Sequence, residues 1–371
     1  MSHPSRTQDL QAIAPVQWRF ALIFLIVLSP LISWPSAIAQ HPVAELPWWT
    51  FWVPLLSIHC IVPFLDGLLP PDSNPAVSGK TSPINKLIPL LCVPCWYAAL
   101  FASAYCLSQI LSNALVFDWR VFSLIAGLVL SLGAIGGILA INPAHELIHR
   151  ASRFERSAGG VLLAGVCYGA FKTEHVRGHH LHVGTERDTA SALKGDSVFS
   201  FAPASFWGTV KNAIAIENER LSRMGVKSFT WQWFTGHEVL RLNAVSIGTA
   251  LLLYVIWGWP ALALFVMASL IAITELEVIN YIEHYGLRRQ KIASRYEPVQ
   301  EHHSWNANSQ ASNAFLFNLQ RHSDHHAHAG KDYLHLASVT SAPQLPYGYG
   351  LMFLIALVPP LWRRIMDHRV P

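Results

Sequence analysis

The residues of this sequence best suited to chemistry are its histidines. Most of the 19 histidines fall between His145 and His335, and they concentrate in four short motifs. The motifs are HELIH from residue 145, EHVRGHH from residue 174, NYIEHYGL from residue 280 and LQRHSDHHA from residue 319. Neutral imidazole is a good ligand for iron, copper, zinc and nickel, whereas carboxylates favour harder ions. The four motifs therefore predict a transition-metal site.

The spacing within the motifs is typical of ligands carried on helices. The first motif has two histidines four residues apart, and the second has the same pair followed directly by a third histidine. Residues three or four apart lie on the same face of a helix. The last motif combines both separations, so its three rings are expected to point the same way. Together the motifs hold more histidines than one tetrahedral zinc can use, so two metal ions are the economical interpretation.

The elements that carry these motifs are predicted to be membrane helices. Hydrophobic residues make up 52% of the 371 residues and charged residues only 13%, against roughly 25% charged residues in an ordinary soluble domain. A soluble protein of this length could not cover so much apolar surface with so few charges. The composition therefore excludes a disordered chain, a coiled coil and a cytosolic α/β enzyme, and it indicates an integral membrane protein.

Charge-free stretches of the sequence define the expected helices. A helix needs about 20 apolar residues to span a bilayer, and the sequence offers enough for six crossings. The predicted helices cover residues 18–38, 46–68, 87–110, 119–142, 239–257 and 260–281. We therefore expect an all-α integral membrane protein in which residues 1–371 form a single membrane-embedded domain.

The distribution of Lys and Arg predicts the orientation of the helices, because cytoplasmic loops carry an excess of these residues. Arg6 and Arg19 precede the first helix, and further basic residues follow the second, fourth and sixth helices, whereas the opposite loops have none. Both termini and the segments 143–238 and 282–371 are thus expected in the cytoplasm, where a helical cap would hold the histidine-rich dimetal site. Residues 36–39 also resemble a signal-peptidase site, which leaves cleavage after the first helix as an alternative.

The four motifs together resemble the signature of the membrane-bound alkane 1-monooxygenases (alkane ω-hydroxylases). This family lies within the histidine-rich non-haem diiron class of membrane desaturases and hydroxylases. The resemblance extends from the second predicted helix to about residue 340, and NYIEHYGL and LQRHSDHHA are its most specific parts. Carried over residue by residue, it implies nine iron-binding histidines. These are His145, His149, His175, His179, His180, His284, His322, His325 and His326.

The same resemblance implies the remaining components of the reaction. These are two iron ions, dioxygen, an n-alkane substrate, and reduced rubredoxin as the electron donor, supplied in turn by rubredoxin reductase and NAD(P)H. It also implies a multi-pass protein of the bacterial inner membrane. The sequence contains one CxxC pair, Cys92 and Cys95, within an apolar stretch. A rubredoxin-type iron site needs a second CxxC pair, so the electron carrier is expected to be a separate chain.

Three carboxylates are candidates for supporting the ligands. Metal-binding histidines usually donate their second ring N–H to a carboxylate or a carbonyl. Glu283 is adjacent to a predicted ligand, and Asp188 is a further candidate. Glu277 lies in the last turns of the sixth helix, where a charge is costly unless it serves a function. The alternative for Glu277, and more so for Glu275, is a side chain that only reaches the membrane interface.

A linear alkane needs a long, narrow apolar channel, and the second helix offers a face for it. Leu55, Ile58 and Val62 recur at the spacing of one helical face. In the family that the motifs resemble, a residue on this helix acts as a gate, and counting back from residues 63–66 places that position near Ile58. The alternative is that this face only packs against a neighbouring helix.

The sequence therefore predicts an enzyme that hydroxylates the terminal carbon of n-alkanes with O₂, giving 1-alkanols. The closest alternative is a related membrane diiron hydroxylase or desaturase that acts on alkylbenzene methyl groups or fatty acyl chains. A zinc metalloprotease would use HELIH with Glu146 as its base, but it would leave the other motifs unexplained. A metal transporter should place polar ligands near the middle of its helices, whereas here the histidines lie at helix ends.

Overall fold

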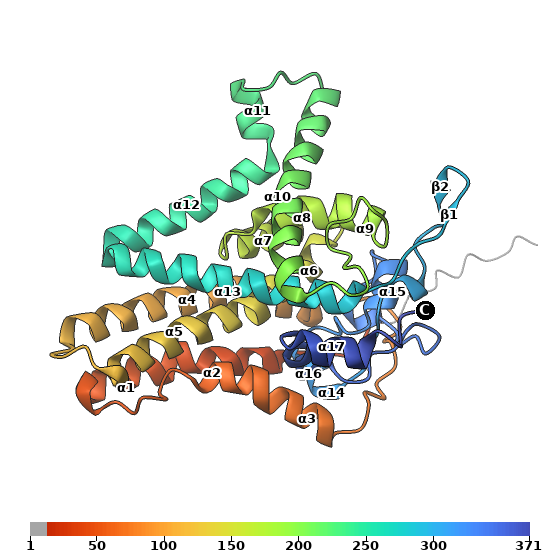
Figure 1. The fold of residues 1–371 in the computed structure, drawn as a ribbon. Coiled ribbons are helices and arrows are strands. Elements are labelled where there is room, and N and C mark those ends of the chain that lie inside the picture. The colour runs from red at the N-terminus through yellow and green to blue at the C-terminus, as the bar shows by residue number, and fades with distance from the viewer. Residues whose placement is uncertain (1–12) are drawn as a thin grey trace, which may run out of the picture.

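The computed structural model describes residues 13–371 and consists almost entirely of helices (Figure 1). The strands of the described residues are β1 (Lys291–Ile292) and β2 (Arg295–Tyr296), which pair as a small antiparallel hairpin. The predicted all-α architecture is confirmed in this sense. Arg6, which contributed to the predicted orientation, lies outside the described residues.

Five helices in the described part of the chain are long and apolar enough to cross a membrane. They are Trp18–Gln40, which ends in α1 (Trp34–Gln40), α4 (Pro83–Asn113), the run Trp119–Ile148 formed by α5 (Trp119–Gly136) and α6 (Asn142–Ile148), α12 (Glu238–Trp257) and α13 (Trp259–His284). Their positions agree with five of the six predicted helices. In Figure 1, α4, α5 and α13 lie side by side, and contacts between all three pairs hold them together.

The second predicted helix is shorter than expected. It runs over Val53–Leu68 and contains α2 (Val53–Leu56) and α3 (Val62–Leu68). The residues just before it form turns, and Pro54 occupies the first helical turn, where a missing N–H costs nothing. The helix therefore begins several residues after the predicted position 46.

Two of the long helices and the shorter helix Val53–Leu68 each contain a widened π turn, and each turn has a proline at a fixed position. The turns cover Ser29–Ser33, Ser57–Ile61 and Gly137–Ile141, and their centres lie four residues before Pro35, Pro63 and Pro143 respectively. A proline in a helix lacks an N–H and its ring clashes with the carbonyl four residues earlier. Widening the turn around that carbonyl relieves the clash. The second and third turns lie beside the functional site described below.

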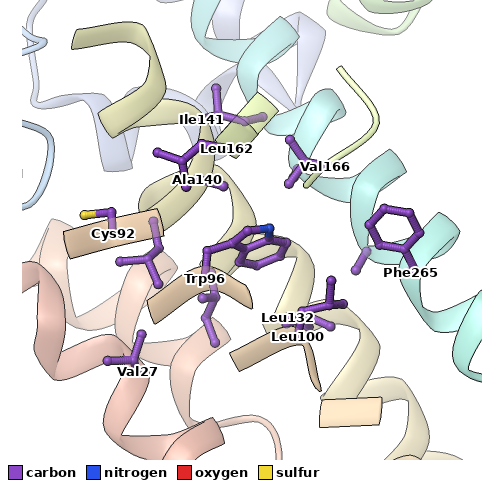
Figure 2. Close-up of a cluster of buried hydrophobic side chains, with 14 of the residues drawn as sticks. Val27, Cys92, Trp96, Leu100, Leu132, Ala140, Ile141, Leu162, Val166 and Phe265 are labelled. Carbon is purple, nitrogen blue, oxygen red and sulfur yellow. The ribbon is translucent and has the colours of Figure 1, made fainter. Parts of the chain in front are cut away.

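The other helices pack against these long helices or against one another, and one of them, α10, is as long as α13. They are α7 (Arg153–Ala164), α8 (Gly169–Glu174), α9 (His180–His182), α10 (Val198–Arg223), α11 (Trp231–Gly236), α14 (Gln310–Phe315), α15 (His322–Ala327), α16 (Tyr349–Ala356) and α17 (Pro359–Met366). A hydrophobic core joins several of them to the long helices. In Figure 2, Trp96 of α4 lies among Leu132 of α5, Leu162 of α7 and Phe265 of α13. The indole N–H of Trp96 donates to the Gly165 carbonyl at 3.0 Å, which fixes the end of α7 against the bundle.

Helices α5 and α13 approach each other closely because glycines lie between them. A Cβ atom added to Gly133 would lie 2.5 Å from the Ile271 side chain, and one added to Gly137 would collide with the Glu275 carboxylate. Small residues four apart are the usual means of close helix packing in membranes, because the backbones can then touch. The two helices end in His-containing motifs, so this contact sets the distance between those motifs.

We predict that Gly133→Ala destabilises the protein by about 1–3 kcal/mol, because the added methyl group forces α5 and α13 apart. The measurement is thermal unfolding of the purified protein in detergent. The double variant Gly133→Ala with Ile271→Ala should recover part of the loss. Gly67→Ala is the matched control, since nothing lies within 4 Å of a Cβ at that position. Equal stability of Gly133→Ala and the unmodified protein would contradict the close contact.

Candidate metal centre

The four histidine motifs meet at one end of the helix bundle. The first motif ends α6, the second covers a π turn at His175–His179 and α9, the third ends α13 at His284, and the fourth forms α15. In Figure 1 these elements lie at the end of the molecule away from the tight turn between α12 and α13. The bundle therefore brings together residues that are up to about half the chain apart.

The nine predicted histidines form two adjacent groups. Within each group, one ligand atom of every residue lies within 4.8 Å of those of the others. The first group is His145, His149, His175, His180 and His325, and the second is His179, His284, His322 and His326. The rings of His180 and His326, one from each group, stack with their centroids 4.4 Å apart. The arrangement offers two neighbouring sites, each with enough ligands for one metal ion.

The way the motifs divide between the groups differs from the helical spacing that the sequence suggests. His145 and His149 share a group, as expected for residues four apart on an α-helix. His175 and His179 do not, because the chain between them is a π turn. In a π turn, hydrogen bonds join residues five apart, and His175 accordingly pairs with His180, their Nε2 atoms 3.1 Å apart.

The last motif is divided as well. His322 and His326 belong to the second group, whereas His325 belongs to the first. The Nε2 atom of His325 lies 3.1 Å from that of His180, whereas the Nε2 atom of His322 lies 3.2 Å from that of His284. The expectation that all three rings point the same way agrees with the structure, because their centroids lie 4.5 to 5.7 Å apart. From this one side, α15 supplies ligand atoms to both adjacent groups.

The chemistry of these side chains fits metal ions. The Nε2 atoms of His145 and His149 are buried and have no hydrogen-bond partner among the described residues. A buried polar atom without a partner is costly, and a metal ion would satisfy it. Burial also lowers the pKa of His175, His180 and His325 well below the usual value. These rings are therefore neutral, which is the form that binds metals.

Two of the three predicted carboxylates contact these histidines. Both oxygens of Asp188 lie 3.0 Å from Nδ1 of His179, so the ring can donate its N–H to the carboxylate. Burial raises the pKa of Asp188, but the neighbouring His179 outweighs this effect and the pKa falls to about 2. Oε2 of Glu283 lies 3.2 Å from Nε2 of His322, and its Oε1 is buried without a hydrogen-bond partner in the described part of the chain. Glu283 is thus placed to add a carboxylate oxygen to the second group.

Glu277, the third predicted carboxylate, forms hydrogen bonds with residues in or near the histidine motifs and not with the histidines themselves. Its side chain is buried and accepts hydrogen bonds from the Tyr168 hydroxyl and from Nδ2 of Asn280, the latter at 3.2 Å. The residue therefore does not reach the membrane interface, which was the alternative from sequence. It joins α13 to the loop before α8, and so helps to place the second motif beside the third.

An apolar cavity ends at the two histidine groups. His145 and His175 of the first group and His322 of the second all line it. The cavity encloses about 1080 Å³, its opening included, and most of its wall is aliphatic or aromatic. Ile58 and Val62 belong to this wall, as the predicted channel face requires, whereas Leu55 is not among the residues that line it. A hydrocarbon chain in this cavity would place one end against the metal centre.

Sequence reasoning missed one polar feature of the cavity wall. His59 and Glu275 both line the cavity, and Nε2 of His59 lies 3.0 Å from Oε1 of Glu275. The sequence favours the membrane interface for Glu275 more than for Glu277, and it does not single out His59. Ionisable residues within membrane helices are rare and usually functional, so this pair could have been noticed from the sequence.

The comparisons with known proteins agree with this site. A model of the fatty acid desaturase family matches residues 119–356, which include all four motifs. Alkane 1-monooxygenase 2 of Pseudomonas aeruginosa is 39% identical over 92% of this chain and 88% of its own length. The chain belongs to the alkane 1-monooxygenase family. Alkane 1-monooxygenase 2 of Alcanivorax borkumensis is 36% identical over 94% of the chain. The hydroxylase component of a xylene/toluene monooxygenase from Pseudomonas putida is 32% identical over 64% of it.

Membership of this family makes the chain an oxidoreductase of the monooxygenase type, and the two histidine groups form its candidate metal-binding site. We predict that His145→Ala and His284→Ala, one in each group, each reduce bound metal and abolish turnover. The reason is that water cannot replace an imidazole ligand with the same field strength. The measurements are elemental analysis and activity of membranes with equal amounts of inserted protein. His182→Ala is the matched control, because His182 follows the second motif but belongs to neither group. Near-full activity of either ligand variant would refute the ligand assignment.

Proposed function

We propose that this protein hydroxylates the terminal carbon of n-alkanes with O₂, giving a 1-alkanol and water. The observation that carries the proposal is the apolar cavity that ends between the two histidine groups. The relatives named alkane 1-monooxygenase support the same reaction. An alkane partitions into the bilayer, so a cavity formed by membrane helices meets its substrate where that substrate is concentrated.

We further propose that the two groups hold two iron ions, with Asp188 and Glu283 as supporting carboxylates. When bound, the iron pair supplies the activation of O₂ that breaking an unactivated C–H bond requires, since no side chain can do this. The protein's own residues hold the ligand rings in position and keep the reacting carbon dry. Asp188 fixes the ring of His179, and the apolar wall around Phe171 and Leu319 keeps water away from the reacting carbon. The two electrons and two protons that convert the second oxygen atom of O₂ to water come from outside the chain.

Reduced rubredoxin is the proposed electron donor, with rubredoxin reductase and NAD(P)H upstream. We also propose that the shorter helix Val53–Leu68 acts as the sixth crossing in one membrane-embedded domain, and that both termini and a helical cap lie in the cytoplasm. The clustering of the histidines at a single end of the bundle supports this orientation, because the basic segments 143–238 and 282–371 supply that end. The membrane would then be the bacterial inner membrane.

A related activity on alkylbenzene methyl groups is the main alternative. The relative whose name indicates such a substrate covers 64% of the chain, whereas the alkane 1-monooxygenases of Pseudomonas aeruginosa cover 92% and 95%. The comparison therefore favours a linear alkane over an aromatic substrate.

Membranes containing the protein, supplied with rubredoxin, its reductase and NADH, should convert some member of the series from octane to hexadecane into its 1-alkanol. Gas chromatography of the products is the measurement, and p-xylene serves as the aromatic comparison. Omitting rubredoxin should stop the reaction, and purified protein should contain about two iron ions per chain. If every alkane of the series is left unchanged while p-xylene is hydroxylated, the alkane proposal fails. One zinc ion per chain in place of iron would also overturn it.

Ile58 is expected to limit chain length, because its side chain lines the cavity and is nearly fully buried. We predict that Ile58→Trp shortens the longest alkane accepted and spares activity on shorter alkanes, since the larger ring fills part of the cavity. Ile61→Trp is the matched control, because Ile61 lies on the same helix and is 52% exposed. The measurement is the yield of 1-alkanol from each alkane of the series, which gives the longest alkane that each variant accepts. An equal loss of activity on all lengths would make Ile58 a packing residue.

A further inference from the structure

The cavity extends from the histidines to a polar end deeper in the bundle. Along α13 its wall runs from Glu283 back to Glu275, and along the run of α5 and α6 from His145 back to Gly137. The two ends of each stretch are eight positions apart, which corresponds to about 12 Å at the rise of an α-helix. This distance is close to the length of an extended medium-length alkyl chain.

The polar end is formed by His59 and Glu275. Nε2 of His59 lies 3.0 Å from Oε1 of Glu275, and the His59 ring stacks on Phe353 with centroids 4.9 Å apart. Oε2 of Glu275 has no hydrogen-bond partner among residues 13–371, and it faces Gly137, where a side chain would collide with it. The two side chains are 17% and 14% exposed. The carboxylate is therefore held in place and still has an oxygen free to accept a hydrogen bond.

Three features of the chain position this pair. His59 is at the centre of the π turn that Pro63 induces, and the turn Gly137–Ile141 that Pro143 induces begins at the glycine facing Glu275. α13 supplies the carboxylate itself. The pair thus occupies a place where two helices are locally widened. An ionisable pair at this depth is costly, and a purely apolar substrate gains nothing from it.

We propose that His59 and Glu275 form a binding subsite for the hydroxyl group of a straight-chain primary alcohol. A few polar groups in an otherwise apolar pocket usually fix the orientation of a ligand. Here the hydroxyl of the alcohol donates to Oε2 of Glu275, and the methyl end of the same molecule reaches the histidines. The product is an α,ω-diol. This inference rests on the proposed alkane hydroxylation, which uses the same metal centre and cavity.

The methyl end of the alcohol undergoes the same hydroxylation that is proposed for alkanes. One C–H bond is replaced by C–OH, and the other oxygen atom of O₂ leaves as water with two protons from the aqueous medium and two electrons from the same protein donor. The bound hydroxyl is unchanged. A fatty acid of equal length is a poor substrate, because its carboxylate would face that of Glu275 and like charges repel.

The test compares decane, 1-decanol and decanoate in membranes supplied with the electron donor. The quantity is the ratio of kcat/KM for 1-decanol to that for decane, with the α,ω-diol measured by gas chromatography. The double variant His59→Leu with Glu275→Leu should lower this ratio by about tenfold or more, as expected when a hydrogen bond to a charged group is lost. Any loss of activity on decane should be smaller than the loss on 1-decanol, because decane makes no hydrogen bond to the pair. Thr274→Leu, next to Glu275 but exposed, is the matched control.

Glu275→Gln provides the second variant, because it keeps the shape and the hydrogen-bond acceptor but removes the charge. It should retain activity on 1-decanol and accept decanoate better than the unmodified protein does. An unchanged ratio in the double variant, or a parallel loss on decane and 1-decanol, would overturn the subsite. So would an unmodified protein that uses decane but not 1-decanol, or Glu275→Gln that still rejects decanoate. If the unmodified protein leaves decane and every other alkane from octane to hexadecane unchanged, the proposed function fails instead.

Discussion

The close contact between α5 and α13 is the constraint on which the metal centre depends. Gly133 and Gly137 let the two backbones approach, and any larger residue would meet Ile271 or Glu275. A glycine inside a helix costs roughly 1 kcal/mol relative to alanine, so the close packing must offset that cost at these two positions. The continuation of α5 carries His145 and His149, and α13 ends at His284. Separating the helices would therefore separate the two histidine groups.

The second requirement is that α15 be held against the bundle, because its histidines contribute to both groups. Arg321, directly before α15, is 1% exposed and pairs with Asp72 at 3.2 Å. It also donates to the Leu336 carbonyl at 2.7 Å. Asp72 pairs in addition with Arg19 at the start of the first helix, at 2.7 Å. Removing one partner of such a buried network leaves an uncompensated charge, so the network ties the last motif to the first membrane helix.

The wall of the cavity is apolar over most of its length and polar at its far end. Near the histidines it must be dry and apolar, so that a C–H bond is the group presented for reaction. At its far end it contains the pair His59 and Glu275, which only an oxygenated chain end can use. The π turns make room for this polar pair within otherwise apolar helices. They widen the helices at His59 and beside Glu275 without breaking them, because prolines four residues later fix where the widening occurs.

The sequence by itself determined the all-helical membrane architecture, the approximate limits of five long helices and the identity of the nine clustered histidines. These features follow from local properties, namely the length of the apolar segments and the residue types within the motifs. Neither property depends on contacts between distant segments. Only the tertiary structure decided how the histidines divide into two groups. The π turn at His175–His179 changes the ligand directions that α-helical spacing predicts, and α15 contributes ligand atoms to both groups. The pairing of His59 with Glu275, which lie 216 residues apart, likewise depends on helix packing. Contacts between distant segments depend on which faces and glycines meet, and no local pattern specifies that.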